Sequence, residues 1–164
     1  MGQAGTYVLV LRVEQEARIR IGRLGTFAFP SGYYFYTGSA RGSGGLEARL
    51  SRHSRPAKRL RWHVDYLLRE ARLVEIWKTP SSRRLECLWT NALLAIAGAR
   101  ALIPGFGSSD CHCRSHLIYF PSAPSFATFV ARLQDLGAAP QPECQMLTEQ
   151  CERKEVRIRP TGQA

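Results

Sequence analysis

Long hydrophobic runs are missing from this sequence of 164 residues. The apolar stretches near residues 7–11 and 92–99 are too short to cross a lipid bilayer. The N-terminus also lacks the basic segment followed by an apolar segment that typically directs export. We therefore expect a protein without membrane spans that resides in the cytoplasm.

Acidic residues are scarce. Asp and Glu total 13 whereas Lys and Arg total 23, so the formal net charge is +10 and the pI is near 10.0. A basic excess attracts polyanions, and nucleic acid is the commonest such partner. Arginine far outnumbers lysine, which a GC-rich genome would produce by itself, so an ordinary solvated basic surface is the alternative.

The distribution of the basic residues favours nucleic acid. Many of them fall in one stretch where Glu47 is the only acidic residue, and such a cluster suits contact with phosphates. The residues that we expect to bind nucleic acid are Arg41, Arg52, Arg55, Lys58, Arg59, Arg61 and His63.

Cysteine is present in an odd number, five residues, which does not suit a framework of disulfides. In a reducing compartment, free thiols or a metal site are the alternatives. Cys111, Cys113 and His116 lie close together in the sequence, and Cys87 lies on an earlier predicted helix. These four residues could form a tetrahedral zinc site that pins a loop, although zinc knuckles usually place two residues between their cysteines. Ordinary buried or free thiols therefore stay open.

The length and a hydrophobic content of 45% suit one soluble domain with a real core. Runs of β-branched and aromatic residues predict strands at 6–13, 17–29 (broken at two glycines), 33–37, 73–78 and 117–120. Helical spacing predicts helices at 46–55, 62–69, 85–96 and 125–136, with Ser81 or Ser82 capping the third. We expect an α/β (α+β) fold with a small mixed or antiparallel sheet flanked by helices. It would occupy residues 1–136, followed by a tail at 137–164 that is loosely attached or adds a final strand at 156–159.

Two polar side chains share an apolar helical face. Leu46, Arg49, Leu50 and His53 follow the spacing i, i+3, i+4, i+7, which turns Arg49 and His53 toward the protein. Glu86 lies at the edge of the apolar stripe of a later helix, roughly 90° from its centre. A carboxylate there can point into a cleft or be an exposed helix residue, and the sequence leaves both open.

The order and spacing of these segments resemble the GIY-YIG nuclease module. Gly5-Thr6-Tyr7 opens one strand, Tyr36-Thr37-Gly38 closes another, and the helix with Arg49 follows. The resemblance implies a metal-dependent endonuclease that hydrolyses DNA phosphodiester bonds with one Mg²⁺ or Mn²⁺. It also implies a role in DNA repair or recombination.

The same resemblance assigns roles to five residues. Tyr7 matches the residue that aligns or deprotonates the attacking water, and Tyr36 matches the tyrosine of the second motif. Arg49 matches the arginine that contacts the scissile phosphate. His53 takes the position of a tyrosine or histidine beside the active site, and Glu86 matches the single metal-binding glutamate.

Residues 32–40, 62–68 and 105–117 are similar to the Uri-type branch of that superfamily, some members of which are fused to DNA-repair glycosylases. With this branch the resemblance covers about residues 5–135. One departure is clear. The asparagine that usually follows the glutamate helix has no counterpart, because Asn91 is too early and the region after Pro104 offers Gly107, Ser108 and Asp110 instead.

Three functional hypotheses follow. The first is the endonuclease; the second is a non-catalytic nucleic-acid-binding module that keeps the fold and the basic face. The third is an adaptor that holds a partner protein through the Cys/His loop and the tail. His63 and Asp65 flank one position of a short helix, where they form a hydrogen-bonded structural pair or line a substrate groove.

Overall fold

The computed structural model of the chain describes residues 2–56, 58–137, 142–146 and 157–159. Its centre is a six-stranded sheet in which every neighbouring pair is antiparallel. The strands lie in the order β6 (Leu117–Phe120), β4 (Gly32–Ala40), β1 (Gly5–Val13), β5 (Arg72–Pro80), β7 (Glu143–Met146) and β8 (Arg157–Arg159). The α+β class with an antiparallel sheet that the sequence predicts is confirmed.

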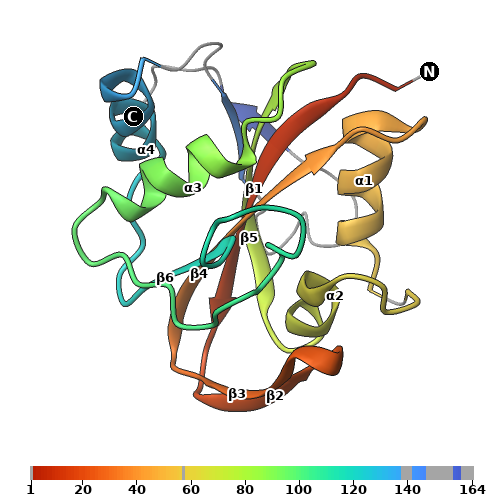
Figure 1. Cartoon of the computed structure of the whole chain (residues 1–164), viewed down its shortest axis with the longest axis vertical. Helices are drawn as coiled ribbons and strands as arrows, with labels where there is room; N and C mark the ends of the chain where they lie inside the picture. Colours follow the sequence, from red (N-terminus) through yellow and green to blue (C-terminus); the bar gives the residue numbers. More distant parts are fainter. Residues whose placement is uncertain (1, 57, 138–141, 147–156, 160–164) are drawn as a thin grey trace.

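The strand β1 lies between β4 and β5, and its side chains are buried on both faces. Alternation sends Leu9 and Leu11 into one core, whereas Val8 and Val10 enter the other. The first core is covered by α1 (Gly45–Ser54), α2 (His63–Leu68) and a ribbon formed by β2 (Ala17–Ile21), the 3-10 turn η1 (Gly22–Leu24) and β3 (Gly25–Phe29). The second core is covered by α3 (Glu86–Leu94) and α4 (Phe126–Asp135), which lie on the other side of the sheet (Figure 1).

The predicted capping of the third helix is wrong. The hydroxyl of Ser81 accepts a hydrogen bond from the backbone amide of Arg83, so it closes a turn after β5. The helix begins at Glu86, five residues after Ser81, its N-cap is Leu85, and no side chain caps it there. Glu86 is consequently its first residue, with the carboxylate at the positive end of the helix.

The C-terminal segment extends the sheet. The strand β7 pairs with β5, and Cys144 is buried in the second core. The predicted last strand corresponds to β8, while position 156 lies outside the described residues. Within the described part of the chain, no helix has the length and apolar character needed to span a membrane.

Candidate active site and metal-binding cluster

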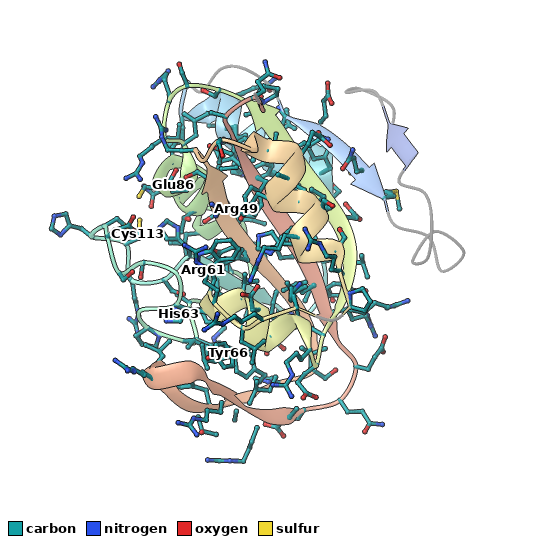
Figure 2. The ribbon with its side chains drawn as sticks, turned by 90° about the vertical axis from the view of Figure 1, so that its right-hand side faces the viewer. Arg49, Arg61, His63, Tyr66, Glu86 and Cys113 are labelled. Atoms are coloured by element: carbon teal, nitrogen blue, oxygen red, sulfur yellow. The ribbon has the colours of Figure 1, made fainter. Side chains whose placement is uncertain are left out.

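A cleft of about 470 Å³ opens where the end of β4, the helices α1 and α2, the first turn of α3 and the loop before β6 meet. The side chains that define it include Tyr36, Arg49, Arg61, His63, Glu86 and Asp110. Figure 2 shows Glu86, Arg49, Arg61 and His63 following one another down the same face. The arginine and the glutamate that the sequence separates by 37 positions therefore border the same space.

Arg49 is held at the cleft by α1 and by an aromatic ring. Its guanidinium lies 4.2 Å from the centre of the Trp62 ring, and one of its N–H groups donates to the Ser39 carbonyl at 3.4 Å. These contacts use only part of the five N–H donors of a guanidinium. Arg49 is therefore positioned to bind an anion that enters the cleft.

Glu86 has a carboxylate oxygen that lacks a partner. Its Oε2 is buried and makes no hydrogen bond to any described residue, and Oε1 lies 4.0 Å from the nearest cation, Arg84 Nε. A buried charged oxygen is unfavourable unless something binds it. Of the two alternatives for Glu86, the structure selects the cleft over the exposed surface.

Tyr7 and His53 lie beneath the cleft, and neither lines it. Both are buried, and Tyr7 Oη lies 2.8 Å from His53 Nε2. Burial, reinforced by Tyr36, raises the pKa of Tyr7 well above its ordinary value. Burial and the nearby Lys58 lower the pKa of His53 to about 3. At neutral pH this is a pair of uncharged groups within the core.

Tyr36 links this buried pair to the cleft. Its ring lies 6.4 Å from that of Tyr7, and the residue is partly exposed in the cleft wall. Burial raises the pKa of Tyr36 to about 12, which the positive charge of Arg49 only partly offsets. The phenol is therefore a hydrogen-bond donor at neutral pH, and a phenolate base is disfavoured.

Gly38 permits this close packing of Tyr7 beside Tyr36. A Cβ atom at position 38 would lie 2.6 Å from Tyr7 Oη, closer than non-bonded atoms can approach. The tripeptide at positions 36–38 thus places Tyr36 in the cleft and leaves room for Tyr7 beside it. This gives a steric reason for glycine at the end of the motif.

The predicted nucleic-acid-binding residues divide into three groups. Arg41, Arg61 and His63 line the cleft. Arg55 and Arg59 are exposed outside it. The remaining two, Arg52 and Lys58, are engaged in structural contacts that hold the end of α1.

Arg52 and Asp65 form the contact that joins α1 to α2. Two N–H groups of Arg52 donate to the two oxygens of the fully buried Asp65 carboxylate, both at 3.0 Å. Asp65 also accepts from the backbone amides of Arg61 and Trp62. Lys58 donates to the carbonyls of Arg52 and His53 and so satisfies the last turn of α1.

The expected hydrogen-bonded pair of His63 and Asp65 is wrong, because each binds a different partner. His63 Nδ1 accepts a hydrogen bond from the Gly107 backbone amide at 2.9 Å. The proton of a neutral ring must then reside on Nε2. Since burial lowers the pKa of His63, the uncharged ring with an Nε2–H donor is the form that borders the cleft.

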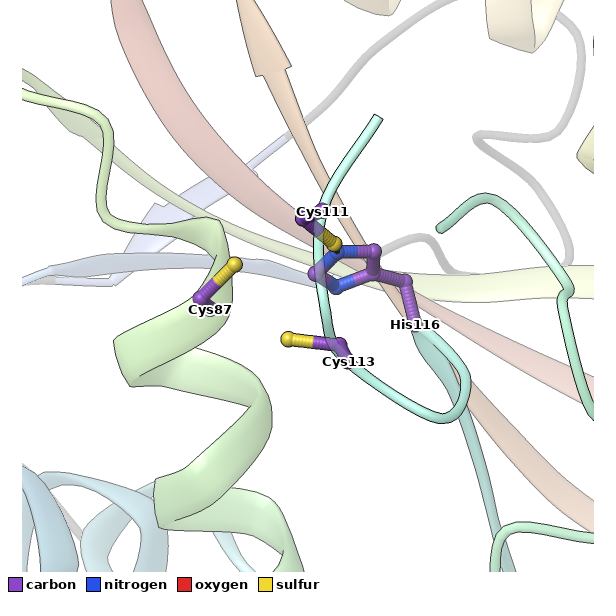
Figure 3. Close-up of side chains that lie close together, drawn as sticks. All are labelled: Cys87, Cys111, Cys113 and His116. Atoms are coloured by element: carbon purple, nitrogen blue, oxygen red, sulfur yellow. Dashed lines mark hydrogen bonds between the residues drawn. The ribbon is translucent and has the colours of Figure 1, made fainter. Parts of the chain in front are cut away.

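A cluster of sulfur and nitrogen atoms adjoins the cleft. The ligand atoms of Cys87, Cys111, Cys113 and His116 all lie within 4.8 Å of one another. Figure 3 shows Cys87 at the start of α3 facing the three residues of the loop before β6. The cluster could hold a metal ion, as the sequence predicts. Burial raises the pKa of Cys87 and Cys113, so a cation is what would favour their thiolates.

Two threonines that are not among the residues predicted from the sequence support His116. The hydroxyls of Thr37 and Thr90 lie 2.8 and 2.7 Å from His116 Nδ1, and Thr90 also donates to the Glu86 carbonyl. Thr90 can therefore accept a hydrogen bond from Nδ1–H, which leaves Nε2 unprotonated and able to bind a metal. Helical spacing from Cys87 to Thr90 is a signal that could have identified one of them.

Comparison with known proteins identifies the family of the chain, with a match that ends before β7 and β8. The chain matches a family described as domain of unknown function DUF123, over residues 6–137. No curated protein and no solved structure matches it. The matched range includes the cleft and the Cys/His cluster in full, and the chain belongs to the DUF123 family.

Proposed function

We propose that this protein is a divalent-metal-dependent endonuclease of the GIY-YIG superfamily, in its Uri-type branch, that hydrolyses DNA phosphodiester bonds. One observation carries the proposal. A single cleft contains a guanidinium, a phenol and a carboxylate with an unsatisfied buried oxygen, from Arg49, Tyr36 and Glu86. Phosphodiester hydrolysis needs an oriented water and stabilisation of charge around one phosphate, and these chemical types can supply both.

The cleft fits a hard divalent cation. Mg²⁺ and Mn²⁺ prefer oxygen ligands and often use one or two carboxylates, with water completing their coordination. Glu86 Oε2 supplies an oxygen without a protein partner, and Asp110 offers a second carboxylate in the same cleft wall. When bound, such an ion would activate water and neutralise charge on the phosphate.

The residues of the chain would then divide the remaining work. Arg49 binds the non-bridging oxygens of the phosphate, with its guanidinium fixed by Trp62. Tyr36 donates a hydrogen bond to the phosphate or orients the attacking water. Tyr7 and His53 act from beneath as positioning residues, because they pack under Tyr36 and do not line the cleft.

His63 adds a neutral donor to the cleft. The Gly107 amide fixes its Nδ1 as an acceptor, so Nε2–H is the group that can reach a phosphate or a leaving oxygen. Arg41 and Arg61 border the same space and suit the phosphates on either side.

We further propose that the Cys/His cluster binds zinc in a structural role. Three thiolates and one imidazole make a closed tetrahedral set, which zinc favours and which leaves no coordination position for substrate. The ion would tie the loop that carries Asp110 to the helix that carries Glu86. Elemental analysis of the purified protein tests this: we expect one zinc per chain, and loss of that zinc in Cys113→Ser but not in Cys144→Ser. Metal-free protein would contradict it.

The nuclease proposal is tested with labelled duplex, branched and single-stranded DNA, incubated with Mg²⁺, Mn²⁺ or a chelator. We expect metal-dependent cleavage by the wild type, and none by Glu86→Gln, which keeps the shape of the side chain but removes its charge. Glu70→Gln, an exposed carboxylate outside this cleft, is the matched control and should cleave normally.

The second candidate is a non-catalytic nucleic-acid-binding module. The absence of a counterpart for the usual asparagine favours it. Salt-sensitive DNA binding without cleavage under any metal condition would establish this function and overturn the nuclease proposal. An adaptor for a partner protein would instead show little affinity for DNA and little dependence on salt.

A further inference from the structure

The ribbon formed by β2, η1 and β3 carries three arginines that the proposed function does not use. Strand alternation places Arg18 and Arg20 on one face, where both are exposed, and Arg23 is exposed at the turn. The opposite face is apolar: Ile19 and Ile21 are buried in the first core. Hydrophobic burial therefore fixes which face of the ribbon presents the guanidiniums.

The exposed face has no internal charge compensation. Residues 17–29 contain three arginines and no acidic residue. Among the described residues, no ion pair joins Arg18, Arg20 or Arg23 to a carboxylate. Glu14, near the start of β2, is paired with Arg12 and Arg72 instead.

The turn of the ribbon lies against the walls of the cleft. A Cβ atom at Gly22 would lie 3.1 Å from the Tyr66 hydroxyl of α2, and one at Gly105 would lie 3.3 Å from the Leu24 side chain. The helix with Tyr66 also carries His63, and the loop with Gly105 continues to Gly107 in the cleft wall. Figure 2 shows His63, then Tyr66, then the ribbon in succession below Arg49.

We propose that the exposed face of the β2–β3 ribbon binds the phosphate backbone of the nucleic acid beside the segment held in the cleft. This inference rests on the proposed function, because the cleft defines where the bound segment of nucleic acid begins. Arg18 and Arg20 are two residues apart on a strand, about 7 Å, which is close to two steps of about 3.4 Å along a nucleic-acid strand. The ligand is identified by charge complementarity: a row of guanidiniums that have no carboxylate partner among the described residues faces a polyanion of regular spacing.

The experiment measures equilibrium binding to a labelled DNA duplex in the Glu86→Gln background without added Mg²⁺ or Mn²⁺, so that no cleavage occurs and the proposed zinc is retained. The test variant is Arg18→Gln/Arg20→Gln. The control is Arg100→Gln/Arg132→Gln, which removes the same charge from the exposed Arg100 and the partly exposed Arg132, both outside the cleft and the ribbon. We expect the test variant to bind about tenfold or more weakly at 0.1 M salt, and the slope of log K against log salt to fall by about 2. The control should change either quantity little.

Chemical modification of the DNA phosphates shows which of them the protein contacts. Ethylation of the phosphates beside the segment held in the cleft should interfere with binding of the Glu86→Gln parent. The same modifications should not interfere with binding of the test variant. Thermal unfolding of both double variants checks that they fold alike.

The outcomes separate the two proposals. If the parent binds and the wild type cleaves DNA, but the test variant binds like the control, the ribbon inference is overturned while the nuclease remains. If the parent binds no DNA, both fail together. If the test variant loses affinity only for vesicles of anionic phospholipid, the surface serves a membrane and the inference is again overturned.

Discussion

At the scale of single residues, Gly38 is where the smallest change should have a visible effect. A methyl group at this position would collide with the hydroxyl of Tyr7, which is buried and cannot swing away freely. We expect Gly38→Ala to lower the free energy of unfolding by about 1–3 kcal/mol, as other overpacking substitutions do. Urea denaturation measures it.

The control for this substitution lies in the same sequence. A Cβ atom at Gly42 meets nothing within 4 Å, so Gly42→Ala should leave the stability nearly unchanged. Equal stability of the two variants would contradict the steric role assigned to Gly38.

His53 should make the protein sensitive to acid. Its pKa is about 3 in the folded protein and 6.5 in the unfolded chain, so between these values the unfolded state binds the additional proton. The contribution of the neutral His53 to the free energy of unfolding is therefore fully present above pH 6.5. It is lost as the pH falls toward 3, with a slope of up to about 1.4 kcal/mol per pH unit.

The measurement is the free energy of unfolding from pH 3 to 7 for the wild type and for His53→Gln, which keeps a polar group near Tyr7. The variant should show a shallower loss of stability in acid. Identical slopes would mean that His53 is not the group that titrates.

At the scale of secondary-structure elements, Asp65 joins two helices and should be difficult to replace. Asp65→Ala would leave two backbone amides without an acceptor in a buried position, and it would remove the carboxylate partner of Arg52, whose guanidinium would keep the Arg59 carbonyl. We expect a loss of about 3 kcal/mol or more, typical of a buried pair that loses one partner. Asp135→Ala breaks the exposed pair with Arg132 on α4 and should change stability by under about 1 kcal/mol. Similar losses in both variants would refute the assignment.

Periodicity and turn chemistry explain which elements could be predicted. The alternation in β1, the breaks at Gly22 and Gly25, and the helical spacing from Leu46 to His53 are local signals, and the structure agrees with each. The strand β7 has only four residues and a single strongly apolar side chain at its end, so its pairing with β5 depends on a contact between segments far apart in the chain.

The candidate site was also predictable only where local sequence signals determine it. Helical spacing correctly predicted that Arg49 and His53 face the protein. The burial of Tyr7 beneath the cleft, in contrast, follows only from how the sheet, α1 and β4 pack together. The separate partners of His63 and Asp65 depend on a loop more than 40 residues away and on the neighbouring helix. No pattern in a single sequence encodes such contacts.

At the scale of the whole molecule, the proposed zinc would tie distant segments together. Its ligands come from α3 and from the loop before β6, and Thr37 of β4 supports one of them. An ion that binds only the folded state stabilises that state. We expect removal of the metal by a strong chelator to lower the melting temperature by several degrees, and readdition of zinc to restore it. An unchanged melting temperature in protein proven to have lost its zinc would contradict the coupling.

The central position of β1 has a consequence for biosynthesis. Its partners β4 and β5 begin 27 and 67 residues further along the chain, yet both faces of β1 are apolar. A ribosome adds about 5–20 residues per second, so β1 emerges roughly 3–13 s before its second neighbour has been translated. During that interval its edge toward β5 is unpaired and its apolar faces are not fully covered. Nascent chains halted before β5 should therefore be bound by chaperones and prone to aggregation, whereas chains that also include α3 and α4, which cover the second face of β1, should not.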